Sequence, residues 1–216
     1  MSLEIILKQL SQGMVTSIEI FILTLIFSIP LGMIVALGRL SKVKLLNIFV
    51  RIYISIMRGT PLMLQLLVVY FGPYYLFKIS IGNNYRMYAV IIAFVLNYAA
   101  YFGEIYRGGI ESIPKGQHEA AKVLGYSRVQ TFIKIILPQV IKRVIPAVTN
   151  EVITLIKDTS LAFSIAVSEM FTVAKAIAAS EKNMVSFAAA GLFYYVFNFI
   201  VAVIMEAIEK KLNYYK

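Results

Sequence analysis

Long stretches without a charged residue are the feature that most constrains how this chain can fold. Four windows lack Asp, Glu, Lys and Arg altogether, namely residues 20–38, 59–77, 87–103 and 183–205. A helix of about 20 apolar residues spans the hydrocarbon core of a bilayer, and about 17 residues is the lower end of the range. The windows therefore predict four membrane-spanning helices. A fifth span is expected over residues 144–156 with continuation to 167, although Glu151, Lys157 and Asp158 interrupt it.

The overall composition agrees with a bilayer environment. The 216 residues are 60% hydrophobic, with a mean hydropathy of +0.79, whereas soluble domains are about 45–50% apolar. We therefore expect an all-α, multi-pass integral membrane protein with about five transmembrane helices, located in the plasma or inner membrane of the cell. No internal repeat is visible, and residues 1–216 are expected to form one transmembrane domain.

The net charge of +10 raises the alternative of nucleic-acid binding, but the distribution of the basic residues favours membrane topology. Fifteen basic residues fall on one predicted side of the membrane and six on the other. The larger set is Arg39, Lys42, Lys44, Arg51, Arg58, Arg107, Lys115, Lys122, Arg128, Lys134, Lys142, Arg143, Lys210, Lys211 and Lys216. Because cytoplasmic loops carry the excess of Lys and Arg, the N-terminus is predicted outside and the C-terminus in the cytoplasm. An odd number of spans agrees with this topology.

Turn and breaker residues divide the rest of the chain. Residues 1–13 are expected to form a short amphipathic outer segment, and the second span is expected from about Leu45, with a proline bend at the Arg58-Gly59-Thr60-Pro61 segment. Gly82-Asn83-Asn84 predicts an outer loop. The basic loop 107–138 is expected to hold two or three short helices, and the fourth span to start near Pro138. Residues 161–182 are expected as a mixed outer stretch before the last span.

Polar residues inside predicted spans are the candidates for a solute path, because ionisable groups in a membrane usually face a cavity or a partner. Glu151, Thr154 and Asp158 share one helical face. Glu151 lies about 17 Å along the helix from Val140, near the middle of the bilayer, and Asp158 lies roughly 10 Å further out. Asn97 is the corresponding candidate in the third span. Carboxylates and amides suit a polar or cationic solute, but the alternative of internal pairing remains open, as for Glu104 with Arg107 or for an interfacial Glu19.

Other kinds of site find little support in the sequence. There is no cysteine, and His118 is the single histidine, so neither a disulfide nor a metal site is expected. No G-x-x-x-x-G-K-[ST] segment occurs, so the chain is not expected to bind ATP through a phosphate loop.

The basic loop carries the most specific motif of the chain. It reads Glu119-Ala120-Ala121, Gly125, then Ile135-x-Leu137-Pro138. This matches the pattern E-A-A-x3-G-x9-I-x-L-P at every spacing. With the segments 58–62, 104–110 and 157–161, it resembles the membrane subunits of ATP-binding-cassette (ABC) importers, in the branch of polar amino-acid permeases for histidine, arginine or glutamine. The resemblance covers essentially the whole chain.

That resemblance implies a type I ABC importer permease fold and a set of partners. Two permease subunits, identical or paralogous, would form one translocation path, and an extracytoplasmic protein would deliver the amino acid. Two cytoplasmic ATPase subunits would bind ATP-Mg, so that this chain would be no enzyme and would hold no cofactor. Glu119, Ala120, Ala121 and Gly125 would couple the loop to the ATPases, and Ser160 lies in a family segment near the path.

The sequence indicates the transported solute less specifically than the type of transporter. The acids Glu151 and Asp158 favour a basic amino acid such as arginine, lysine or histidine. Permeases for glutamine or other polar amino acids resemble the chain in the same segments. A secondary transporter would be expected to show inverted repeats and matching broken helices, and a purely structural membrane scaffold would not need acids in mid-bilayer.

Overall fold

The computed structural model describes residues 2–80, 82 and 84–212, and most of these residues are helical. In chain order these are α1 (Leu3–Arg39), α2 (Lys44–Gly59), α3 (Leu62–Phe77), α4 (Tyr85–Glu111), α5 (Lys115–Val123), α6 (Arg128–Thr131), the π-helical turn η1 (Phe132–Ile136), α7 (Leu137–Asp158), the 3₁₀ helix η2 (Thr159–Ile165), α8 (Met170–Glu181) and α9 (Val185–Leu212). Within the predicted outer loop Asn83 lies outside the described residues, as does Lys216.

Three helices, α1, α4 and α9, are each long and apolar enough to cross a membrane. Two bent pairs raise the number of candidate spans in the described residues to as many as five: α2 with α3, bent by 110°, and residues 128–165 with α8, bent by 58°. The segment expected separately over residues 1–13 is instead the beginning of α1. Its Ile6, Leu10 and Gly13 are buried, and the backbone of Gly13 lies against Met170 at the start of α8.

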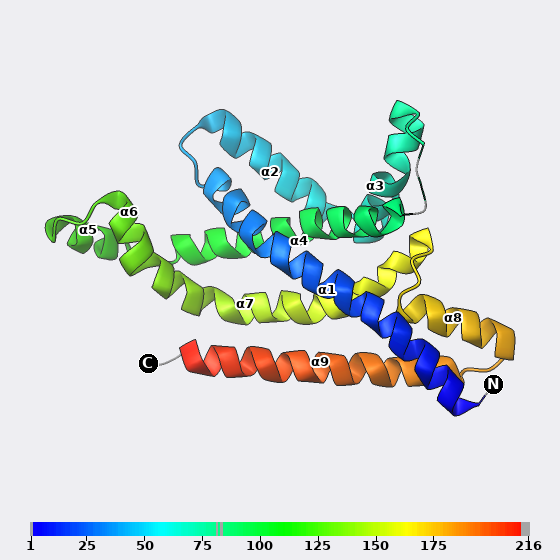
Figure 1. Cartoon of the computed structure of the whole chain (residues 1–216). Coiled ribbons are helices and arrows are strands. Elements are labelled where there is room, and N and C mark those ends of the chain that lie inside the picture. Colours follow the sequence, from blue (N-terminus) through cyan, green and yellow to red (C-terminus); the bar gives the residue numbers. More distant parts are fainter. Residues whose placement is uncertain (1, 81, 83, 213–216) are drawn as a thin grey trace.

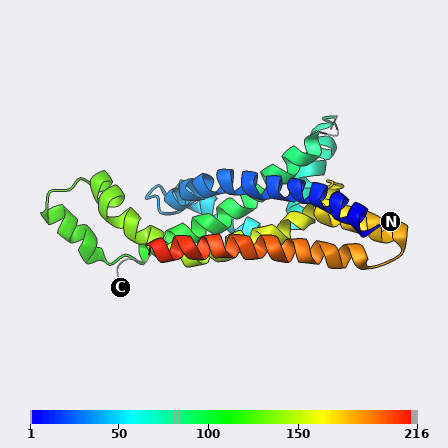
Figure 2. The same ribbon diagram turned by 60° about the horizontal axis from the view of Figure 1, so that its bottom comes forward.

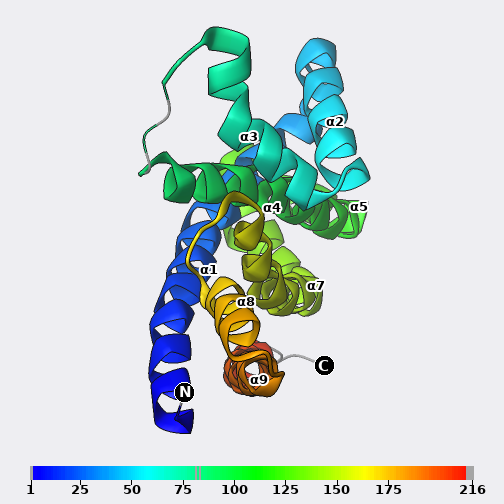
Figure 3. The same cartoon turned by 90° about the vertical axis from the view of Figure 1, so that its right-hand side faces the viewer.

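The helices are arranged so that the start of α1 and the end of α9 lie at opposite ends of the bundle (Figures 1 and 2). The α1–α2 connection, the α5–α6 region and the end of α9 lie at one end, while the start of α1 and the α8–α9 connection lie at the other (Figures 1 and 2). α2 and α3 pack on one side of α4, and α7 and α9 lie on its other side (Figures 1 and 3). The segments rich in Lys and Arg therefore gather at one end.

Small residues allow α1 and α4 to cross closely. A Cβ added to Gly32 would lie 2.7 Å from Cβ of Phe102, and one added to Gly103 would lie 2.5 Å from Cγ1 of Val35. Apolar side chains gain no hydrophobic energy against lipid, so close van der Waals packing is what holds such helices together. This contact fixes α4 at the centre of the structure.

The second predicted span is broken rather than gently bent. Thr60 is extended (φ −126°, ψ 149°), and α3 begins directly after Pro61. A proline disfavours helical backbone in the residue before it and cannot donate a backbone hydrogen bond. The break therefore leaves carbonyl oxygens at the end of α2 that other groups must satisfy.

The basic loop contains the short helices that its helix-starting and helix-ending residues predicted. α5 follows Pro114, and α6 follows Ser127. The fourth span starts near Pro138 as expected, since α7 begins at Leu137 with Pro138 in its first turn, and the π turn η1 joins it to α6 so that residues 128–165 form one helical segment. In this π turn the N–H of Leu137 bonds to the carbonyl of Phe132. Pro138, the next residue, has no N–H to donate.

Candidate functional site

A cavity of about 300 Å³ opens where the α2–α3 break faces α4 and α7. Its lining residues are Thr60, Pro61 and Leu62 at the break, Asn97, Tyr98 and Tyr101 on α4, Glu151, Thr154 and Asp158 on α7, and Leu161 on η2. The proline that breaks the second span is thus part of the cavity wall. The cavity is polar for a membrane protein, with two carboxylates among its lining residues.

The α7 side of the cavity follows from helical spacing. Glu151 and Asp158 are seven residues apart and both half-buried, with Thr154 between them. Asp158 ends α7 and accepts a hydrogen bond from the Tyr98 hydroxyl at 2.7 Å. The Thr154 hydroxyl donates to the Asn150 carbonyl at 2.9 Å. Within the described residues, Glu151 receives no side-chain hydrogen bond comparable to the one on Asp158.

Two amide side chains brace the broken helix that forms the opposite wall. Asn97 donates from Nδ2 to the Met57 carbonyl at 3.0 Å and to Oε1 of Gln65 at 2.9 Å. Gln65 donates from Nε2 to the carbonyls of Met57 and Thr60, at 3.0 Å and 3.1 Å, and to the Thr60 hydroxyl at 2.8 Å. The carbonyls freed by the break are therefore satisfied inside the protein, as a membrane environment requires.

A positive charge also lies beside the cavity. The guanidinium of Arg58 sits over the ring of Tyr101, 5.3 Å from its centroid, within the range of a cation–π contact. Its charge acts on Glu151, as does the charge of Asp158. From the sequence, Arg58 was counted with the basic residues of the inner side and was also placed in the bend of the second span; the structure places it in the last turn of α2, at the break and beside the cavity.

The structure brings together four of the five residues proposed from the sequence as solute-binding. Glu151, Asn97, Asp158 and Thr154 line the same cavity, and Ser160 is not among its lining residues. The Ser160 hydroxyl donates to the Lys157 carbonyl at 2.7 Å. The amide nitrogen of Asn97 is committed to the helix break, so only its remaining surface faces the cavity.

Sequence reasoning missed the contributions of Tyr98 and Arg58 to this site. Tyr98 directly follows Asn97, so an aromatic hydroxyl next to this predicted polar residue of the third span was the available signal. For Arg58 the signal was its position directly before Gly59-Thr60-Pro61, because a helix that stops at an internal break leaves its last side chains at that break.

Of the proposed coupling residues, Glu119, Ala120 and Ala121 lie in α5, and Gly125 lies in the turn between α5 and α6. Gly125 has φ +78°, the left-handed conformation that a glycine adopts without steric cost. The N–H of Tyr126 bonds to the Ala121 carbonyl and that of Gly125 to the Lys122 carbonyl, which is a Schellman motif. Ser127 then starts α6 with a capping box that it forms with Gln130.

The surface of this loop combines polar and apolar groups. Glu119 and Ala120 are exposed, but Ala121 is buried, so Ala121 packs within the loop rather than presenting surface. Val123, Leu124 and Val129 are 87%, 72% and 67% exposed. Apolar side chains gathered at the tip of an otherwise polar, basic loop are characteristic of a protein–protein contact.

The sequence of residues 28–214 matches the family model described as "Binding-protein-dependent transport system inner membrane component". The chain belongs to this family. Among its relatives is the L-cystine transport system permease protein of Bacillus subtilis (strain 168), 38% identical over 208 residues, covering 95% of this chain and 87% of the relative. The octopine transport system permease protein of Rhizobium radiobacter is 38% identical over 85% of this chain and 79% of its own length. The arginine transport system permease protein of Bacillus subtilis (strain 168) is 36% identical over 94% and 91%.

The solved structures agree with membership of this transport family. A crystal structure of an amino acid ABC transporter with histidines superposes with a TM-score of 0.85 at 27% identity, covering 94% of both chains. An inward-facing methionine ABC transporter, at 16% identity and a TM-score of 0.73, shows the same fold. The expected type I ABC importer permease fold is therefore confirmed, and the protein is a multi-pass membrane component of a transport system.

Proposed function

We propose that this family member is the permease subunit of an ATP-driven importer for basic amino acids such as arginine, lysine or histidine. The observation that carries the proposal is the charge set of the cavity: two carboxylates, Glu151 and Asp158, with one guanidinium, Arg58, beside them. In a low-dielectric site a charged group of the solute needs an opposite charge within hydrogen-bond reach.

Counting charges distinguishes the classes of amino acid. The α-carboxylate of any amino acid would pair with Arg58, and its α-ammonium with Asp158, which Tyr98 holds in place. Glu151 would then be left over, and a cationic side chain would neutralise it. Glutamine would leave that carboxylate without a charged partner, although it could still donate a hydrogen bond to it.

The same proposal assigns the two ends of the bundle. The end that carries the basic segments and the α5–α6 loop would be cytoplasmic, with the N-terminus outside. ATPase subunits would dock on Val123, Leu124 and Glu119, whose exposure supports a protein contact there. A second permease subunit would complete the path, and an extracytoplasmic binding protein would deliver the solute.

Uptake into proteoliposomes tests the cargo. The complete transporter, with its ATPase subunits and binding protein, would take up radiolabelled arginine in an ATP-dependent manner, and excess unlabelled lysine would compete more strongly than glutamine. ATP-driven uptake of glutamine without competition by arginine would remove the assignment to basic amino acids. Relatives named for cystine and glutamine make a zwitterionic polar amino acid the alternative outcome.

Co-purification tests the coupling surface separately from the cargo. Substituting serine for both Val123 and Leu124 is expected to reduce recovery of the ATPase subunits while the permease keeps its thermal stability, because both side chains are exposed. The matched control replaces Leu192 of α9, which is 62% exposed, by serine. Equal recovery of the ATPases with both variants would show that these apolar side chains do not form the docking surface.

A further inference from the structure

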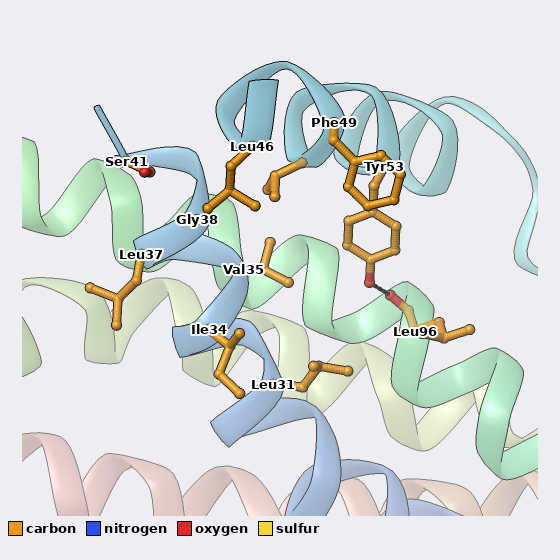
Figure 4. A pocket seen from close by; sticks show the side chains of 11 residues that line it. Leu31, Ile34, Val35, Leu37, Gly38, Ser41, Leu46, Phe49, Tyr53 and Leu96 are labelled. Carbon is orange, nitrogen blue, oxygen red and sulfur yellow. Dashed lines mark hydrogen bonds between the residues drawn. The ribbon is translucent and has the colours of Figure 1, made fainter. Parts of the chain in front are cut away.

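An apolar groove separates the second half of α1 from the first half of α2. It has a volume of about 520 Å³, and its floor is formed by α4 (Figure 4). Leu31 and Val35 lie on the α1 wall, Leu46, Phe49 and Tyr53 on the α2 wall, and Leu96 on α4 (Figure 4). It is separate from the polar cavity at the α2–α3 break, which has none of these residues in its lining.

The groove offers almost nothing polar to an occupant. The Tyr53 hydroxyl, its most prominent polar group, already donates to the Leu96 carbonyl (Figure 4). Next to it, Phe49 is 71% exposed on the open side. Near the connection between the helices, Val50 closes the groove against Gly38, where an added Cβ would lie 3.0 Å from Cγ2 of Val50. Such a space is filled by hydrocarbon rather than by a polar molecule.

Basic residues cluster where the groove reaches the α1–α2 connection. Arg39, Lys42 and Lys44 occur within six residues, and no Asp or Glu occurs between Glu19 and Glu104. Arg39 is held by a hydrogen bond from Nη1 to Oδ1 of Asn47 at 3.0 Å. Lys42 and Lys44 are exposed, and neither forms a salt bridge with a carboxylate of the described residues.

We propose that this groove binds a phospholipid with an anionic headgroup, one acyl chain lying between α1 and α2 and the phosphate group lying against Arg39, Lys42 and Lys44. Basic groups beside the membrane end of a helix attract anionic lipids, and the apolar walls supply the site for the chain. Charge argues against a second copy of this chain as the occupant, since that copy would bring its own basic residues to the same end of the bundle. With the proposed topology, the lipid belongs to the cytoplasmic leaflet.

The chain contains no tryptophan, which permits a direct test. Phe49→Trp places the only tryptophan of this chain on the rim of the groove, and quenching of its fluorescence is measured in vesicles that contain brominated phosphatidylglycerol or brominated phosphatidylcholine at equal mole fractions. Ile204→Trp, on the exposed face of α9 near Glu206, is the matched control. Both variants are measured in the isolated chain and in the assembled transporter.

We expect phosphatidylglycerol to quench the groove tryptophan more than phosphatidylcholine does, and the control tryptophan to show no such preference. Adding Lys42→Gln and Lys44→Gln to Phe49→Trp should lower the preference about 30-fold, since each basic residue near a membrane surface contributes about fivefold to anionic lipid affinity. Both lysines are exposed, so their loss should leave the thermal stability unchanged. Equal quenching by the two lipids would overturn the proposal. Absence of quenching by either lipid in the assembled transporter would overturn it as well, by showing that protein covers the groove.

Discussion

Glu151→Gln is the most informative single change, because it removes one charge from the cavity and leaves the shape of the side chain. Glu151 is half-buried and interacts with the charges of Arg58 and Asp158. Hydrogen bonds to charged groups contribute about 1.5–3 kcal/mol, and partial exposure favours the lower end. A loss of about 1.5 kcal/mol corresponds to a roughly tenfold change in affinity. We expect the half-saturating arginine concentration to rise about tenfold, while that of glutamine changes little.

The assay is ATP-driven uptake of labelled arginine and glutamine by the reconstituted transporter over a range of concentrations. Glu19→Gln is the control, because Glu19 is an exposed acid of α1 outside the lining of the cavity. Co-purification of the ATPase subunits should be the same for both variants, since neither change touches the α5–α6 loop. If Glu151→Gln leaves arginine uptake and its preference over glutamine unaltered, Glu151 has a structural role and the charge count above is refuted.

Three further changes test the fold around the cavity and the loop. Gly109→Ala should lower the temperature of unfolding in detergent, at a cost of about 1–3 kcal/mol, because its Cβ would lie 2.3 Å from Cγ1 of Val144; Gly108→Ala, which has open space, is the control. Gly125→Ala should cost about 1–2 kcal/mol through its positive φ and reduce ATPase co-purification. Gln65→Leu should leave carbonyls of the break unsatisfied, at about 1–3 kcal/mol, and speed hydrogen exchange at the α2–α3 junction.

Each of these expectations has a result that contradicts it. Equal unfolding temperatures for the two glycine variants of α4 would mean that α4 and α7 adjust without cost. Full ATPase recovery with Gly125→Ala would show that the turn geometry is not needed for docking. Exchange at the junction that stays as slow as in the unchanged protein would show that Asn97 alone satisfies the break.

The sequence was a good guide to elements whose cause is local. Uncharged windows located the long helices, and Pro114, Gly125 and Ser127 located the short helices of the basic loop. The break at Thr60-Pro61 was anticipated only as a bend, because its size depends on Gln65 and Asn97 satisfying the exposed carbonyls. Such side-chain partners become visible only once the helices are packed together.

In the candidate site, too, the features set by local spacing were predictable and those set by packing between helices were not. Helical spacing placed Glu151, Thr154 and Asp158 on one face of α7, and all three line the cavity. Arg58 could not be located in the same way, since its position depends on where α2 stops and on the ring of Tyr101 from another helix. The bond between Tyr98 and Asp158 joins residues 60 positions apart, which no periodicity within one helix reveals.

The uninterrupted helix from residue 128 to 165 has a mechanical consequence. It joins the loop tip directly to Glu151, about 35 Å away along the helix at 1.5 Å per residue. A displacement of α6 would therefore be transmitted along this helical segment to the acids of the cavity. The π turn at Phe132–Ile136, where the usual i to i−4 hydrogen bonds are altered, is the place where this helical segment would bend most easily. The stiffness of this one turn would therefore set how much of a displacement at the loop reaches the acids of the cavity.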